Sequence, residues 1–147
     1  MKKTVDDYLN EIDYRELNQY KPTAFSIEYM NFVKMVNTGK DDIQTSPVLH
    51  YKMIDGLVGK KTHIANLCSR GLAKTSIYGE FLVLYLAVFN TIPNFGKVDV
   101  IMYVADSMEN GAKSFRKNVE SRYNESAFLR NIFLKLNSQI MIFSLLI

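Results

Sequence analysis

A short polar segment, Cys68 to Thr75, lies between two apolar stretches and constrains the fold more than any other part of the chain. The apolar run before it, His63 to Leu67, has the length of a buried strand, whereas the run from Thr75 to Asn90 is long enough to form a helix. A strand, a tight turn and a helix whose first turn carries Lys and Thr are typical of a phosphate-binding loop. The sequence therefore predicts an anion site at residues 68–75.

The residues of this loop suit phosphate, with two departures from the pattern G-x-x-x-x-G-K-[ST]. Free amides and aligned dipoles at a helix N-terminus attract anions. Lys74 can reach β- and γ-phosphates, and the Thr75 hydroxyl can ligate Mg²⁺. Cys68 and Ala73 occupy the two glycine positions, and a glycine occurs instead at Gly71. Alanine is tolerable at position 73 if its φ is negative, because only a positive φ strongly demands glycine. The alternative is a strand, turn and helix without a ligand.

The segment Ser69-Arg70-Gly71-Leu72-Ala73-Lys74-Thr75 resembles a known motif, the Walker A form Arg-x-x-Gly-Lys-Thr of the large terminase subunits of tailed phages. The segments Ser76 to Phe89 and Val98 to Arg122 are also similar to that family, so the resemblance covers about Ser46 to Asn124. It implies the N-terminal part of an ATPase that packages viral DNA, with ATP and Mg²⁺ as cofactors.

The resemblance also implies roles for single residues. Thr75 would ligate the metal, and Arg70, at the position of the family's Walker A arginine, would be the catalytic residue that stabilises charge on the γ-phosphate. The nucleotide would be bound by Ser69, Arg70, Gly71, Leu72, Ala73, Lys74 and Thr75. Pro47-Val48-Leu49-His50 looks like the segment that precedes Walker A in the family. This makes Gln44, His50 and Tyr51 candidates to hold the adenine base, the alternative being a helix cap and a solvent-exposed imidazole.

The partners and the location follow from the same resemblance. It implies double-stranded phage DNA, the portal and the small terminase subunit as partners, and a homo-oligomer in the full-length protein. It places the protein in the cytoplasm of the infected host, at the procapsid during packaging. We expect no membrane contact, because the apolar segment Ile77 to Ile92 is interrupted by Glu80 and is shorter than a bilayer span of about 20 residues.

Composition bounds these expectations. The chain has 147 residues, 48% of them hydrophobic and 22% charged, which is enough for one small globular domain and too short for a two-domain enzyme. The net charge of +3 is too small to indicate nucleic acid by itself. The single cysteine, Cys68, excludes an internal disulfide and fits a reducing compartment. The polar segment Met1 to Tyr20 is not a secretory signal and predicts a short surface helix.

The periodicity of the chain predicts four further helices and two strands. Two consecutive strand–helix pairs form a right-handed βαβ unit, so the predicted class is α/β, a P-loop NTPase-like parallel sheet flanked by helices. The predicted helices are Ala24 to Asn37 (packed on the sheet and capped by Thr23), Pro47 to Val58, Thr75 to Asn90 and Met108 to Asn124; the predicted strands are Thr62 to Leu67 and Val98 to Ala105.

Three regions follow from this pattern. Residues 1–45 form a helical lead-in, residues 46–130 a partial ATPase core, and residues 131–147 an atypical tail. The tail contains no Gly, Pro or acidic residue, so we expect it to be a truncated or frame-shifted end, with the sheet left incomplete. A strand at Ile140 to Leu145 is the alternative.

Catalysis by this chain is uncertain. Val100 to Asp106 fits the loose rule for a Walker B strand, but Ser107 follows where a catalytic Glu is expected, and Asp106 or Ser107 fits equally well as a helix cap. Neither a convincing Walker B acid pair nor a nuclease domain can be found. We therefore expect poor ATP hydrolysis or none, because phosphoryl transfer needs an acid on the far side of the metal.

Two other functions remain open. One is a different P-loop NTPase, such as the first lobe of a helicase. The other is a nucleic-acid-binding module without catalysis, in which the basic helix contacts nucleic acid through Lys113, Arg116, Lys117 and Arg122. A solvated helix face explains those charges as well. Glu80, the odd acid in the apolar helix, indicates either a polar cavity near the nucleotide or a favourable place in the helix dipole.

Overall fold

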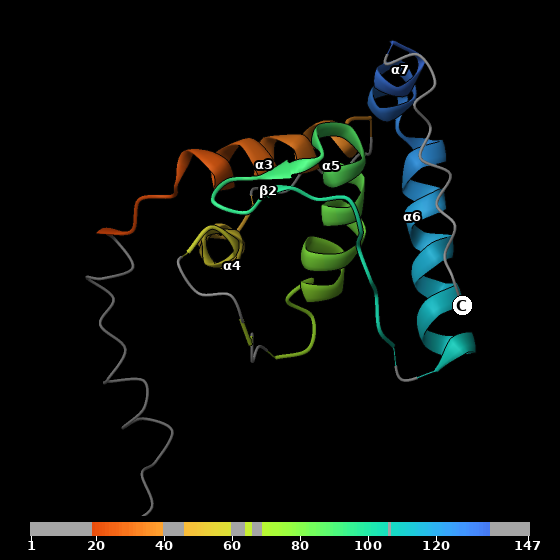
Figure 1. The fold of residues 1–147 in the computed structure, drawn as a ribbon, viewed down its shortest axis with the longest axis horizontal. Helices are drawn as coiled ribbons and strands as arrows, with labels where there is room; N and C mark the ends of the chain where they lie inside the picture. The colour runs from red at the N-terminus through yellow and green to blue at the C-terminus, as the bar shows by residue number, and fades with distance from the viewer. Residues whose placement is uncertain (1–18, 40–45, 60–63, 66–68, 106, 136–147) are drawn as a thin grey trace, which may run out of the picture.

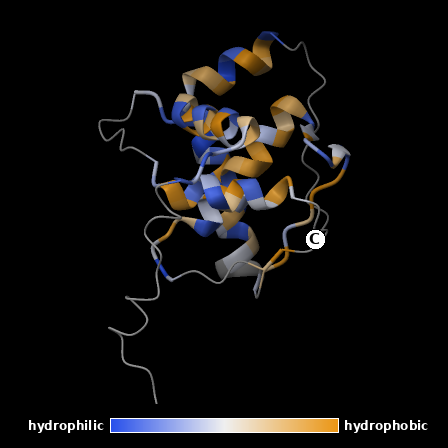
Figure 2. Ribbon diagram, turned by 90° about the vertical axis from the view of Figure 1, so that its left-hand side faces the viewer, coloured by the Kyte–Doolittle hydropathy of each residue, from blue (hydrophilic) through white to orange (hydrophobic). Residues whose placement is uncertain are grey.

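The computed structural model describes residues 19–39, 46–59, 64–65, 69–105 and 107–135, and most of these are helical (Figure 1). The helices pack on one another around a shared apolar core. Hydrophobic and hydrophilic residues alternate along the helices (Figure 2), as amphipathic packing requires. The elements are α3 (Ala24–Val36), α4 (Val48–Leu57), η1 (Ser76–Glu80), α5 (Phe81–Phe89), β1 (Thr91–Ile92), β2 (Gly96–Lys97), η2 (Met108–Lys113), α6 (Ser114–Glu125) and α7 (Ala127–Lys135).

Helix α3 begins where the sequence predicts. The Thr23 side chain accepts a hydrogen bond from the Ser26 amide at 3.2 Å, which caps the helix. Its apolar face is buried, and Phe32 makes edge contacts with the rings of Tyr85 and Phe89. The expected neighbour of this helix was a sheet, but the structure packs it against α4, α5 and α7.

The predicted helix from Thr75 to Asn90 is confirmed, and it runs from Lys74 to Phe89. Its first part, η1, is a π-helix, and the Tyr29 hydroxyl donates to the Ile77 carbonyl there at 2.5 Å. Such wide turns expose a carbonyl to partners outside the helix. Asn90 ends the helix in the left-handed region, with φ of 56°.

A small hairpin follows this helix. Strands β1 and β2 pair antiparallel, with Thr91 opposite Lys97 and Ile92 opposite Gly96. The Phe95 amide donates to the Ile92 carbonyl at 3.1 Å and closes the turn between the two strands.

The parallel sheet is not observed in the described part of the chain. The predicted strand Val98 to Ala105 contains no strand residue, and three of its apolar side chains, Val100, Met102 and Val104, are 82%, 83% and 78% exposed. A strand forms only beside another strand, and none of the described residues offers one here. Most of the other predicted strand, Thr62 to Leu67, lies outside the described residues, so the complete sheet stays a prediction.

The remaining helices agree with the sequence in part. Helix α4 follows Pro47 as predicted and ends before Gly59. Helices η2 and α6 cover the predicted helix Met108 to Asn124. Helix α7, capped by the Ser126 side chain that accepts from the Leu129 amide at 3.3 Å, was not predicted. The predicted helix in residues 1–20 and the strand at 140–145 lie mostly or wholly outside the described residues.

Among the described residues, no helix is long and apolar enough to cross a membrane. The longest helical stretches are amphipathic or interrupted by charged side chains such as Glu80 and Arg122, which are joined to each other across the packed helices.

Candidate functional site

The predicted phosphate loop forms a tight turn before its helix. Arg70 and Gly71 lie in the turn, and Gly71 has φ of 90°. Ala73 has φ of 53°, so the condition under which alanine is tolerable here, a negative φ, is not met. The chain must turn sharply to enter the helix at Lys74, and a left-handed residue makes that turn. For a side chain with a Cβ this conformation costs about 1–2 kcal/mol.

The first turn of the helix presents backbone amides to this loop. The Ile77 amide donates to the Ala73 carbonyl at 2.8 Å. The amides of residues 75 and 76 precede this bond and have no acceptor within the helix. With the positive end of the helix dipole, they form the part of the loop best suited to an anion.

The charged residues of the loop take different positions. The Lys74 ammonium donates to the Ser69 carbonyl at 3.1 Å, so it folds back across the loop that it closes. Arg70 is exposed on the turn. Both cations therefore lie within one short loop, in reach of an anion placed at the helix end.

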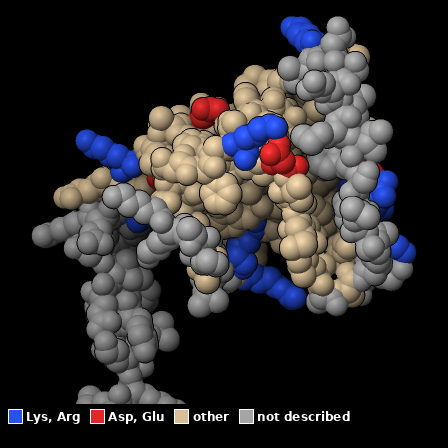
Figure 3. Space-filling view, viewed as in Figure 1, with Lys and Arg blue, Asp and Glu red and all other residues tan. Residues whose placement is uncertain are grey.

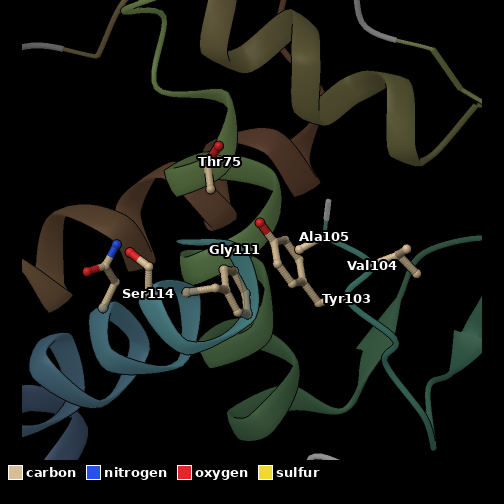
Figure 4. Close-up of a pocket in the computed structure, with 8 residues that line it drawn as sticks. Thr75, Tyr103, Val104, Ala105, Gly111 and Ser114 are labelled. Atoms are coloured by element: carbon tan, nitrogen blue, oxygen red, sulfur yellow. The ribbon is translucent and has the colours of Figure 1, made fainter. Parts of the chain in front are cut away.

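A cavity of about 400 Å³ lies beside Thr75 (Figure 4). It brings together three parts of the chain: the helix start, the end of the segment Val98 to Ala105, and the start of α6. Figure 4 shows the Tyr103 hydroxyl directed toward the helix that carries Thr75, with Ser114 on another side. The lining residues are Thr75, Tyr103, Val104, Ala105, Gly111, Ser114, Phe115 and Asn118.

The aromatic wall of this cavity depends on one glycine. The rings of Tyr103 and Phe115 are stacked, with centroids 3.9 Å apart and planes 7° from parallel. A Cβ on Gly79 would lie 2.7 Å from Cε2 of Phe115. The absence of a side chain at Gly79 therefore lets Phe115 reach the helix that follows the loop. Sequence reasoning missed this contact, although a glycine inside an apolar helix was its signal.

Glu80 joins this helix to α6. Its carboxylate is 4% exposed and accepts from the Arg122 Nε at 2.6 Å and from the Asn118 amide nitrogen at 2.9 Å. The Arg122 guanidinium also lies over the Phe81 ring, 4.2 Å from its centroid. Ion pairing with Arg122, which was not predicted, explains the acid better than the helix dipole does. The interpretation of Glu80 as a residue near a polar cavity holds in one respect, since its partner Asn118 lines the cavity beside Thr75.

The basic helix is less available than its sequence indicates. Arg122 is bound to Glu80, and Arg116 pairs with Glu120 at 2.6 Å on the surface. The face drawn in Figure 3 shows basic side chains dispersed among uncharged ones rather than a continuous basic patch. On α6 itself, the surface pair of Arg116 with Glu120 favours the solvated-face interpretation.

The other candidate residues are not brought to the cavity. His50 lies in the first turn of α4, and Tyr51 packs against the apolar core. Neither lines the cavity beside Thr75. Gln44 and Asp106 lie outside the described residues, so their roles stay predictions.

The donor chemistry around Thr75 suits Mg²⁺ held mainly by a nucleotide. Mg²⁺ prefers oxygen ligands and keeps several waters when it binds through phosphates. Thr75, Tyr103 and Ser114 supply hydroxyl oxygens, and Asn118 supplies an amide oxygen. In the described part of the chain, no group of three His, Cys, Asp or Glu side chains could hold a metal by itself. These residues therefore fit a phosphate-bound metal better than a metal held by the protein alone.

Comparison with known proteins gives no further guide to this site. The chain matches no protein-family model, no curated protein and no solved structure.

Proposed function

We propose that the chain binds ATP with Mg²⁺ at the loop Ser69 to Thr75. The observation that carries this proposal is the position of Thr75, which lies in the first turn of a helix behind a left-handed residue and lines a cavity of about 400 Å³. The loop supplies backbone amides and two cations next to Thr75, and the described lining residues of the cavity supply neutral oxygens.

Each residue of the loop has a defined part in this proposal. The Lys74 ammonium leaves the Ser69 carbonyl and contacts the β- and γ-phosphates, whose charge it matches better than a neutral carbonyl does. The amides of Gly71 to Thr75 bind phosphate oxygens. The Thr75 hydroxyl contacts Mg²⁺, which supplies charge neutralisation of the phosphates when bound. Arg70 is exposed and can fork onto the γ-phosphate as charge develops there.

The biological role that fits best is that of a large terminase subunit of tailed phages, as the N-terminal part of its ATPase. The support is the Walker A resemblance of Ser69 to Thr75 together with the helix that follows it. In this role double-stranded DNA, the portal and the small subunit are the partners. Turnover by this chain alone is expected to be slow or absent, since none of the described residues that line the cavity beside Thr75 is an Asp or Glu.

Calorimetric titration of the chain with ATP and Mg²⁺ tests the binding proposal. Lys74→Ala is expected to weaken ATP binding by about 2–4 kcal/mol, because it removes a charge-assisted contact in a partly desolvated loop. Lys117→Ala, which removes an exposed lysine of α6, is the matched control and should leave ATP affinity unchanged. Circular dichroism checks that each variant is folded. Absence of ATP binding by the parent, or equal affinity in Lys74→Ala, would overturn the proposal.

A further inference from the structure

The cavity beside Thr75 has polar groups that the described part of the chain leaves without partners. The hydroxyls of Thr75, Tyr103 and Ser114 form no hydrogen bond with described residues, although all three line the same cavity. Hydroxyls both donate and accept hydrogen bonds, so such a set is suited to water molecules or to a polar ligand.

Asn118 adds a group of fixed orientation. Its amide nitrogen donates to the Glu80 carboxylate at 2.9 Å, and a carboxylate can only accept. The nitrogen is therefore committed to Glu80, which leaves the Asn118 carbonyl oxygen as the atom that can accept from a ligand. The Glu80 carboxylate is itself held by Arg122 at 2.6 Å, so the orientation of Asn118 has two supports.

We propose that this cavity holds the water molecules of a nucleotide-bound Mg²⁺, and that Ser114 and Asn118 are positioning residues that accept hydrogen bonds from those waters. The inference rests on the proposed function, which places the metal at the Thr75 hydroxyl. Waters on Mg²⁺ are strong donors, and the described lining residues offer acceptors without any charge. At about 30 Å³ per water, 400 Å³ accommodates the hydration shell with room to spare.

The described lining residues are neutral, which argues against the phosphates as occupants of the cavity. Phosphate oxygens need cations or backbone amides; the cations Arg70 and Lys74 belong to the loop, and none of the described lining residues is a cation. A nucleoside would also fit by volume. Inorganic tripolyphosphate distinguishes the metal-bound waters from a nucleoside as occupants, since it supplies phosphates that bind Mg²⁺ but has no nucleoside.

The test measures affinity for ATP and for tripolyphosphate by calorimetry, each with Mg²⁺ and with EDTA. For each compound, the readout is the affinity with Mg²⁺ divided by the affinity with EDTA, which measures the enhancement of binding by the metal. Ser114→Ala and Asn118→Ala should each lower this ratio severalfold, up to about tenfold as for other outer-shell partners of metals. The affinity in EDTA should not change. Asn131→Ala, an exposed asparagine on α7, is the control.

If Asn118→Ala perturbs the fold, Ser114→Ala still tests the inference, because the Ser114 hydroxyl forms no hydrogen bond with a described residue. An equal loss of affinity with Mg²⁺ and with EDTA would overturn the inference, but the proposed nucleotide binding by the parent chain would stand. A loss seen with ATP but not with tripolyphosphate would assign the cavity to the nucleoside and also overturn it. A parent chain that binds neither compound would instead defeat the proposed function, and the inference with it.

Discussion

Two apolar stretches of this chain differ in burial: the helix from Lys74 to Phe89 and the segment Val98 to Ala105. The helix buries Ile77, Phe81 and Leu84 among its neighbours, whereas the segment leaves Val100 and Met102 more than four-fifths exposed. A helix satisfies its own backbone and needs only side-chain partners. A strand needs another strand for its backbone as well. Apolar composition therefore predicts a need for burial. The helix meets that need through side-chain contacts, whereas the segment has no described strand beside it and stays exposed.

The largest expected effect lies on the helix side of this comparison. Leu84→Ala should lower the free energy of unfolding by about 3 kcal/mol, because it removes a buried side chain and leaves a cavity. Urea denaturation measures the change. Leu134→Ala, which truncates a leucine that is 77% exposed on α7, should change the free energy by less than about 0.5 kcal/mol. Equal effects of the two substitutions would contradict the described core.

The Glu80 pair tests whether the helix is fixed to α6 by charge as well as by apolar contacts. Glu80→Gln should lower the free energy of unfolding by about 2 kcal/mol, since it leaves the partly buried Arg122 without its countercharge. Glu120→Gln breaks the exposed pair with Arg116 and should cost no more than about 0.5 kcal/mol. Both are measured by urea denaturation, and a smaller effect for Glu80 than for Glu120 would mean that the buried pair does not persist in solution.

The contact between α3 and α4 predicts a pH dependence on the packed side. Desolvation raises the pKa of Asp55, but hydrogen bonds from Thr23 and Tyr20 outweigh it and lower the pKa below its ordinary 3.8. The folded chain thus binds this proton less readily than the unfolded chain. The contribution of Asp55 to stability is complete above the ordinary pKa and is lost as the pH falls through the lowered one.

Asp55→Asn checks this sign. The stability difference between the parent and the variant should be about 1 kcal/mol at pH 7 and should shrink as the pH falls through the lowered pKa of Asp55. Urea denaturation at several pH values gives the difference. A difference that grows on acidification would mean that the carboxylate is not stabilised by Thr23 and Tyr20.

The loop at the start of the helix predicts a smaller effect of opposite sign. Ala73→Gly should raise the free energy of unfolding by about 0.5 kcal/mol, because relief of the left-handed strain exceeds the entropy that glycine adds to the unfolded chain. Lys117→Gly in α6 is the contrasting control, and glycine there should destabilise by about 1 kcal/mol. Destabilisation by Ala73→Gly would show that the φ of residue 73 is negative in solution.

The smallest expected effect lies on the other side of the comparison. Met102→Ala should change the free energy of unfolding by less than about 0.5 kcal/mol, because its side chain is 83% exposed. Met53→Ala, at a methionine that is 4% exposed, should cost about 2–4 kcal/mol. A cost for Met102 as large as that for Met53 would indicate that the segment is covered in solution, as the predicted parallel sheet requires.

The sequence by itself determined most of the described helices and the Thr23 cap of α3, because these depend on neighbouring residues, although it did not predict α7. Thr23, Pro47 and the long apolar run after Thr75 each predict what the structure contains. Local signals act over a few residues, so no knowledge of the rest of the chain is needed to interpret them.

Only the tertiary structure decided which residues meet. The pairing of Glu80 with Arg122, the seat of Phe115 on Gly79 and the cavity shared by Thr75, Tyr103 and Ser114 join residues far apart in the sequence. The φ of Ala73 was likewise set by the path of the chain into the helix rather than by the alanine. Long-range contacts of this kind depend on how the elements pack, and a pattern of residue types along the chain does not specify that packing.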